Sequence, residues 1–472
     1  MQNKILNHGD TKTPRINFLN ASVSPWFTRV LLWLAPILFL LAFFFLPLSK
    51  ILTLAFNTSA FTKANFQLIL STFGFTFYQA TLSAILTFIL GIPSAILFSR
   101  FNFRGKSLLR ALTAVPFMLP TVVVASCFNA LFGNHGIFSF IFHPSPFLLI
   151  LFAHIFYNTT IVIRIIGNAL SRLDPKLEQS ARSLGADAFH VWKNITLPLL
   201  RPSLLAAALL VFMFDFTSFG VILLLGSSNF STLEVEIYLR VLKLPNLPLA
   251  ALLSIVQLVF TLIFSILYTR TINQVTAQTA PRFSISHPPK TINEKIFVAT
   301  FIVLLSSFFF LPLASLPIRS MTRLEADRGQ RGEVQYGFTT DYYQELFINR
   351  RGSLFYVPPI QAARNSLGYA SITVLLSLAL GYPAAYALAK PTHLEKFLDP
   401  LIMLPLGASA VMLGLGFIIS FGRSLASPWF VPIAHTLVAL PFVIRTLQPT
   451  LASSPERLRQ AASTLGASPF RV

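Results

Sequence analysis

VLLWLAPILFLLAFFFLPL, residues 30–48, is a run of 19 residues without a charged, hydroxyl or amide side chain. A helix needs about 20 mostly apolar residues to cross the hydrocarbon core of a bilayer. The basic leader before the run is long, and no small-residue cleavage site follows closely, so a secretory signal is disfavoured. The run therefore predicts an uncleaved first transmembrane helix.

The composition extends this prediction to the whole chain. Of the 472 residues, 54% are hydrophobic and 11% are charged, whereas soluble domains carry about 25% charged residues. The net charge of +20 could indicate nucleic acid, but the basic residues separate apolar runs and do not gather on one face. We therefore expect the lipid bilayer as a partner and no nucleic acid. The single cysteine, Cys127, is interpreted as a packing residue.

Further apolar stretches predict an all-α polytopic membrane protein. Ten stretches are long enough to span, or nearly so: about 30–48, 73–98, 111–132, 146–164, 203–225, 249–268, 296–318, 366–389, 400–420 and 430–449. Lys and Arg are enriched in cytoplasmic loops. With the N-terminus inside, most basic residues fall on inner segments, and the short outer loops hold Lys50, Lys63, Arg240, Lys243 and Arg423. We therefore expect a cytoplasmic N-terminus.

The two halves of the chain share an ordered series of short motifs. Three pairs have one offset of 281 residues, and two more lie upstream with slightly different offsets. The pairs are Ala153-His154 with Ala434-His435, Val162-Ile163-Arg164 with Val443-Ile444-Arg445, Leu184-Gly185-Ala186 with Leu465-Gly466-Ala467, Gly91-Ile92-Pro93 with Gly381-Tyr382-Pro383, and Met118-Leu119-Pro120 with Met403-Leu404-Pro405. Both copies begin with an inside-to-outside span, so we predict a parallel duplication of a six-span unit.

The duplication divides the chain into four expected segments. These are a cytoplasmic leader at 1–29, a first repeat of about six spans at 30–270, a cytoplasmic linker at 271–295, and a second repeat of about four spans at 296–472. The first repeat runs about 85 residues beyond Gly185, whereas the chain stops six residues after Gly466. We therefore expect a second repeat that is truncated in its inner loop. The outer loop 319–365 has no role that the sequence reveals.

One inner loop carries the functional signal. Residues 177–202 read LEQSARSLGADAFHVWKNITLPLLRP. This pattern predicts a cytoplasmic helix, a turn at Gly185 in which glycine avoids side-chain strain, and a second amphipathic helix. Phe189, Trp192 and Ile195 follow at i, i+3 and i+6, which predicts an apolar stripe on a charged segment.

This loop resembles the EAA motif of ABC importer permeases, in which Ala-Ala-x3-Gly-x9-Ile-x-Leu-Pro marks the coupling helix. The matching residues are Ser180, Ala181, Gly185, Ile195, Leu197 and Pro198, with Gln179 where the family most often has Glu. The second copy matches its front half with Gln460, Ala461, Ala462 and Gly466. The resemblance implies two parallel repeats of the type I (MetI-like) importer permease fold, in a bacterial inner membrane.

The resemblance also implies partners. Each coupling helix would sit in a cleft of a separate ABC ATPase dimer, with Gly185, Phe189 and Trp192 at the contact, and an extracytoplasmic binding protein would deliver the substrate. The chain itself is expected to be no enzyme and to hold no cofactor. Gly105-Lys106-Ser107 looks like the end of a phosphate-binding loop, but Arg100 stands where its first glycine is required.

A fused chain with two repeats is similar to the permeases for ferric iron and for thiamine, and the two substrates stay open. Segments 153–158, 212–220 and 232–238 carry this likeness. Asp215 is an acidic residue well inside an expected span. It is either a group in the translocation pathway or a helix-pairing residue.

Glu234 and Glu236 fall on an expected outer segment, facing a binding protein or solvent. His154 and His435 lack companion ligands, so packing or hydrogen bonding is favoured and no metal site is expected.

Two other classes remain as alternatives. A secondary active transporter also has twelve spans in parallel halves, but it should carry coupling charges within the membrane, and only Asp215 fits. A membrane enzyme would need paired carboxylates, a metal cluster or a nucleophile with its base, and the expected spans offer none of these. The inner motif, which occurs twice, favours the importer.

Overall fold

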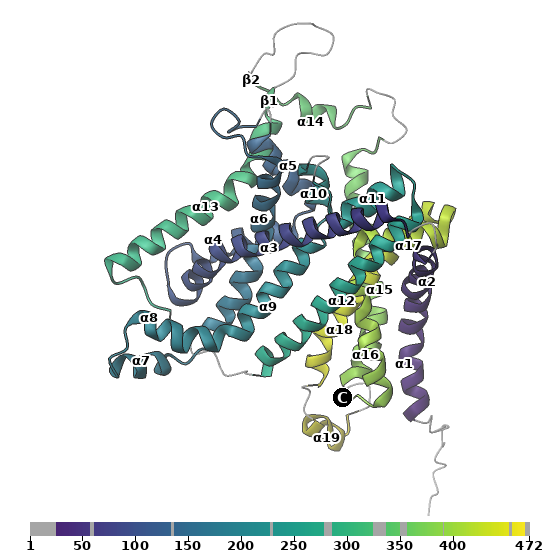
Figure 1. Cartoon of the computed structure of the whole chain (residues 1–472). Coiled ribbons are helices and arrows are strands. Elements are labelled where there is room, and N and C mark those ends of the chain that lie inside the picture. Colours follow the sequence, from purple (N-terminus) through teal and green to yellow (C-terminus); the bar gives the residue numbers. More distant parts are fainter. Residues whose placement is uncertain are drawn as a thin grey trace, which may run out of the picture.

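The computed structural model describes residues 25–56, 61–133, 136–226, 230–277, 286–323, 337–349, 356–389, 391–452 and 456–467. The described chain is almost entirely helical (Figure 1). The first 24 residues of the leader and much of the outer loop 319–365 lie outside the described residues. This architecture confirms the all-α polytopic prediction.

Among the residues described, eight helices are long and apolar enough to cross a membrane. The first joins α1 (Pro25–Leu40) to α2 (Leu46–Ala55) through one π-helical turn, Leu41–Phe45. The others are α3 (Lys63–Arg100), α6 (Pro146–Leu170), α9 (Leu197–Phe216), α12 (Leu247–Ala277), α13 (Ile292–Ser320), α15 (Pro359–Ala389) and α18 (Phe430–Ala452).

Two of the ten expected spans are sharply bent helix pairs. The stretch expected at 111–132 consists of α4 (Lys106–Met118) and α5 (Thr121–Phe132), which meet at 111°. The stretch expected at 400–420 consists of α16 (His393–Gly407) and α17 (Ala410–Phe421), where the bend is 99°. Pro120 explains the first bend, because proline lacks the N–H that would continue the helix. At the second bend the Ser409 hydroxyl accepts a hydrogen bond from the Met412 N–H at 3.0 Å and starts a new helix.

Short elements complete the described chain. On one end of the molecule are β1 (Thr322–Arg323), β2 (Gly337–Phe338) and α14 (Asp341–Glu345). Toward the opposite end lie α7 (Pro175–Ser183), α8 (Ala188–Val191) and α19 (Glu456–Thr464), as Figure 1 shows. The remaining elements are α10 (Gly220–Leu225), α11 (Leu233–Leu242), a second π-helical turn at Trp192–Thr196 and a 3-10 turn at Gly422–Ala426.

Corresponding glycines bring α3 close to α6 and α15 close to α18. A Cβ added to Gly91 would lie 2.5 Å from Val162 Cγ1, and one added to Gly381 would lie 2.6 Å from Val443 Cγ1. These four residues are the ones that the sequence motifs align. Small residues allow such close helix approach inside membranes, where dispersion contacts replace the hydrophobic effect.

The first helix of each half packs against the other half. Trp33, Leu40 and Phe44 share a buried cluster with residues of α15, α17 and α18. In return, Phe309 of α13 stacks on Phe156 of α6 with 5.3 Å between ring centroids, and Ser315 Oγ donates to the carbonyl of Cys127 at 3.0 Å. The two halves are therefore interlocked.

Gly91→Ala should destabilise the protein by about 1–3 kcal/mol, because overpacking forces a rigid, β-branched neighbour to move. Gly74→Ala on the same helix is the matched control, since a Cβ there meets nothing within 4 Å. The control should gain up to about 1 kcal/mol, because alanine is the better helix former. Unfolding in mixed detergent micelles measures both values. Equal stability of the two variants would contradict the close approach at Gly91.

Candidate functional site

The inner loop folds as a helix, a glycine turn and a second helix. Asp174 caps the start of α7 by accepting from the Lys176 N–H. Gly185 follows its end with φ +87°, in the left-handed region that disfavours side chains. The N–H of Ala186 donates to the carbonyl of Ala181 at 3.1 Å, which closes the helix end in the pattern typical of such glycine turns.

Asp187 then caps α8. The backbone N–H of His190 donates to Asp187 Oδ1 at 2.7 Å, and this hydrogen bond lowers the pKa of that carboxyl below its ordinary value. After α8 the chain makes a π-helical turn, Trp192–Thr196, and continues into α9. The loop thus runs without a break from α8 through the π-helical turn into the long apolar helix α9.

The predicted apolar stripe is only partly exposed. Phe189 is 64% exposed, whereas Trp192 and Ile195 are half-buried. Trp192 packs against the cluster around Ile166 and Leu200, because the π-helical turn changes the helical register at this point. Of the other motif residues, Ala181 is half-buried and these are exposed: Gln179, Ser180, Gly185, Leu197 and Pro198.

Sequence reasoning missed the most exposed apolar side chain of the loop. Leu184, directly before the glycine, is 89% exposed. Its counterpart Leu465 is 88% exposed. An isolated leucine at a charged helix end was the available signal. Each leucine projects from the turn, where a partner protein could cover it.

The second copy repeats the glycine turn. Gly466 has φ +80°, and the N–H of Ala467 donates to the carbonyl of Ala462 at 3.0 Å. Gln460 and Ala461 are exposed on α19, and Ala462 is half-buried. Residues 468–472 lie outside the described part of the chain. The two turns therefore have the same backbone design.

Glu178, which the motif does not include, joins the loop to the spans. Its carboxylate forms an ion pair with Arg100 at the end of α3. Its Oε1 also accepts a hydrogen bond from Thr196 Oγ1 at 3.0 Å, just before α9. Glu178 therefore ties α7 to the end of α3 and to the residue that precedes α9.

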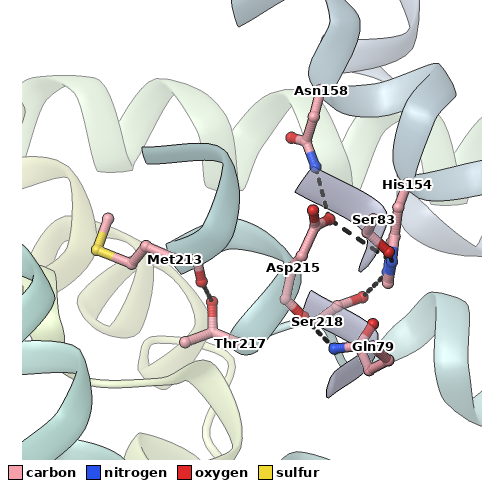
Figure 2. A network of polar contacts seen from close by, with 8 residues as sticks. All are labelled: Gln79, Ser83, His154, Asn158, Met213, Asp215, Thr217 and Ser218. Carbon is pink, nitrogen blue, oxygen red and sulfur yellow. Dashed lines mark hydrogen bonds and ion pairs between the residues drawn. The ribbon is translucent and has the colours of Figure 1, made fainter. Parts of the chain in front are cut away.

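Asp215 lies in a buried polar network between α3, α6 and α9 (Figure 2). Asn158 Nδ2 donates to Asp215 Oδ1 at 2.7 Å, and Gln79 Nε2 donates to the Asp215 backbone carbonyl at 2.8 Å. His154 Nδ1 lies 3.6 Å from Asp215 Oδ1. Asp215 Oδ2 has no hydrogen-bond partner among the described residues. Three helices therefore meet around one fully buried side chain, and both interpretations of Asp215, helix pairing and a group of the pathway, stay predictions.

The two histidines of the repeat have different surroundings. His154 is buried, with hydrogen bonds of 2.9 Å linking Nδ1 to Ser83 Oγ and Nε2 to Ser218 Oγ. His435 is exposed. No group of three or more metal-ligating side chains occurs among the residues described here.

The expectation that Glu234 and Glu236 face a binding protein or solvent was wrong. Both are buried, at 1% and 5% exposure. Gln257 Nε2 donates to Glu234 Oε1 at 2.5 Å, and Arg240 Nε donates to Glu236 Oε1 at 2.7 Å. The reason is that α11 packs against α3, α12 and α17 instead of forming a surface segment.

Comparison with known proteins shows which family this chain resembles. Residues 87–277 match the family described as binding-protein-dependent transport system inner membrane component. This segment includes α7, the glycine turn at Gly185 and α9. This segment is therefore similar to the permease components of binding-protein-dependent transporters, and the chain resembles an ABC importer permease.

Three relatives align along most of the chain. The thiamine transport system permease protein ThiP of Brucella abortus (strain 2308) is 27% identical over 414 residues, covering 84% of this chain and 72% of the relative. The protein of the same name from Escherichia coli (strain K12) is 25% identical, with 83% and 72% covered. A probable ABC transporter permease protein, y4fN of Sinorhizobium fredii (strain NBRC 101917 / NGR234), is 23% identical, with 84% and 72% covered.

Substitutions at Asp215 should separate a helix-pairing role from a pathway role. Asp215→Leu removes the acceptor for Asn158 and should cost about 1–3 kcal/mol, because a buried amide is left unpaired. Asp215→Asn keeps an acceptor oxygen and should retain most of the stability. Unfolding in detergent and substrate uptake are measured on both variants. A large loss of uptake by stable Asp215→Asn would assign the carboxylate to the pathway instead.

Proposed function

We propose that this chain is the permease subunit of an ATP-driven importer, with its N-terminus in the bacterial cytoplasm. The membrane-spanning helices of its two repeats, 30–270 and 296–472, together form the translocation pathway. A separate ABC ATPase dimer and an extracytoplasmic substrate-binding protein complete the transporter. The expectation of coupling loops at residues 179–198 and 460–466 is part of this proposal.

The observation that carries the proposal is the glycine turn that occurs twice. Gly185 and Gly466 have the same backbone conformation, and each follows a leucine that is almost fully exposed. Exposed large apolar side chains on otherwise polar loops are typical of protein–protein contacts. Phe189 enlarges the apolar surface of the first loop. A dimeric ATPase offers two equivalent clefts for two such loops.

The mechanism follows from the connections of the first loop. When the ATPase subunits close, they pull α7, and the Arg100–Glu178 ion pair transmits the pull to α3. The Thr196–Glu178 hydrogen bond transmits it to α9. Since α3 and α9 also hold Gln79 and Asp215, the displacement reaches the polar network inside the membrane. A tilt of these helices would switch access between the two faces.

Thiamine is the proposed substrate. Two relatives that align along most of the chain are named as thiamine permeases. Ferric iron, the other substrate class that the sequence resembles, becomes an outcome of the test. A secondary active transporter is the second candidate class, and it would transport without an ATPase.

Gly185→Asp should reduce uptake to near background while membrane insertion persists. An L residue in the left-handed region costs about 1–2 kcal/mol, and the added charge changes the surface beside Leu184 and Phe189. Gly105→Asp is the control, because Gly105 is also left-handed, with φ +80° and open space around an added Cβ, but lies outside both loops. Uptake and copurification of an ATPase are measured in cells. Normal uptake by Gly185→Asp would exclude the coupling role.

Vesicles containing this chain, its ATPase and its binding protein should take up labelled thiamine only when ATP is present. Ferric iron should not compete for that uptake. Competition by iron, or uptake of iron without thiamine, would assign ferric iron as the substrate instead of thiamine. Uptake driven by an ion gradient without ATP would assign the chain to the secondary transporters.

A further inference from the structure

A basic cavity of about 470 Å³ lies between α4, α6 and the end of α3. Three cationic side chains line it, Lys106, Arg110 and Arg164. Hydroxyl and amide groups, including Ser99, Asn168 and Ser171, form much of the remaining wall. The lining contains no carboxylate among the described residues. Such a cavity concentrates positive potential, because charges at its wall are shielded from bulk water.

The protein does not neutralise these three charges within its described part. Lys106 Nζ donates to the carbonyl of Phe101 at 2.6 Å. Arg110 donates to the carbonyl of Phe98 at 3.2 Å, and its guanidinium lies 5.4 Å from the centroid of the Phe98 ring. These contacts orient the cations but bring no countercharge. Arg164 is exposed at the cavity, and no ion pair to it occurs among the described residues.

In the second half of the chain, the arginine at the corresponding position is neutralised by a carboxylate. Arg445, the counterpart of Arg164, forms an ion pair with Asp399 at 3.2 Å. In the first half the position aligned with Asp399 is Ala114, by the offset of 285 that relates Met118 to Met403. The acidic partner is therefore missing from the first half, while its arginine is retained.

We propose that this cavity binds a phosphate group, supplied by an anionic phospholipid headgroup or by a soluble phosphate ester. Guanidinium groups pair with phosphate oxygens through two parallel hydrogen bonds, and the neighbouring hydroxyl and amide groups donate to the remaining oxygens. The cavity lies where apolar helices end, at the level at which headgroups meet basic pockets between helices. Phe98 offers an apolar wall beside the charged groups.

The site is coupled to the inner loop by position. Ser171 lies at the end of α6, four residues before α7 begins at Pro175. Ser99 lies next to Arg100, which holds Glu178 of α7. A bound phosphate would therefore stabilise the start of the loop that the ATPase is proposed to engage. The binding site itself does not depend on that proposal.

Native mass spectrometry of the full chain in detergent tests the site. Delipidated protein is given phosphatidylglycerol or phosphatidylcholine with identical acyl chains, and glycerol 1-phosphate is added as the soluble competitor. Wild type should retain phosphatidylglycerol preferentially, and Arg164→Gln should weaken this retention about fivefold, which corresponds to one basic residue near an anionic headgroup. Arg445→Gln is the matched control and should retain it as wild type does.

The outcomes separate the two sources of phosphate. Displacement of phosphatidylglycerol by glycerol 1-phosphate identifies a soluble phosphate ester as a ligand, and resistance to displacement identifies the lipid. Arg164→Gln changes an exposed side chain, so folding is retained, and equal thermal unfolding of the variant and wild type checks this. Arg110→Gln provides a second variant with the same expected direction. Equal retention by wild type and both cavity variants, with no binding of glycerol 1-phosphate, overturns the proposal.

Discussion

Hydrocarbon offers no hydrogen-bond partners, so the backbone of this chain must satisfy itself wherever it crosses the membrane. Long helices meet that requirement, and at the two bent helix pairs side chains replace some of the lost backbone hydrogen bonds. At the bend between α4 and α5, Tyr157 of α6 donates to the carbonyl of Leu119 at 3.1 Å. At the second bend, the Ser409 hydroxyl receives an N–H of α17. At each bend a side chain of the protein therefore satisfies one of the freed backbone groups.

The same constraint explains the polar network around Asp215. A lone carboxyl in this environment would be expensive, and a membrane protein retains one only when neighbouring helices supply partners. Here Asn158 donates to the Asp215 carboxyl and Gln79 donates to the Asp215 backbone carbonyl, each from a different helix. The network thereby connects α3, α6 and α9, the three helices that also support the inner loop. Pairing inside the membrane and support of the loop depend on one group of helices.

A structural feature can be predicted from the sequence when the residues that determine it lie close together along the chain. The membrane-spanning helices and the two glycine turns depend on neighbouring residues, so both could be predicted from the sequence. The partners of Asp215 come from positions 57 and 136 residues away, and no local pattern specifies them. Glu234 and Glu236 were misplaced for the same reason, because the contacts of α11 with distant helices bury them. The bends at Pro120 and Ser409 had local signals, but their angles depend on the packing of α5 and α17. Glu178 was overlooked because its value lies in its contact with Arg100, not in its place in the motif.

The exchange of first helices between the halves has a consequence for biosynthesis. Trp33 Nε1 donates to Glu395 Oε1 at 3.3 Å across 362 residues of chain. The first helix is synthesised first, so these partners become available to it only after α15 to α18 have been inserted. Until then α2 has α12 of its own half to pack against, whereas Trp33, Leu40 and Phe44 lack the partners that α15, α17 and α18 provide later. The second half is therefore completed against the part of the first helix that contains Trp33, Leu40 and Phe44.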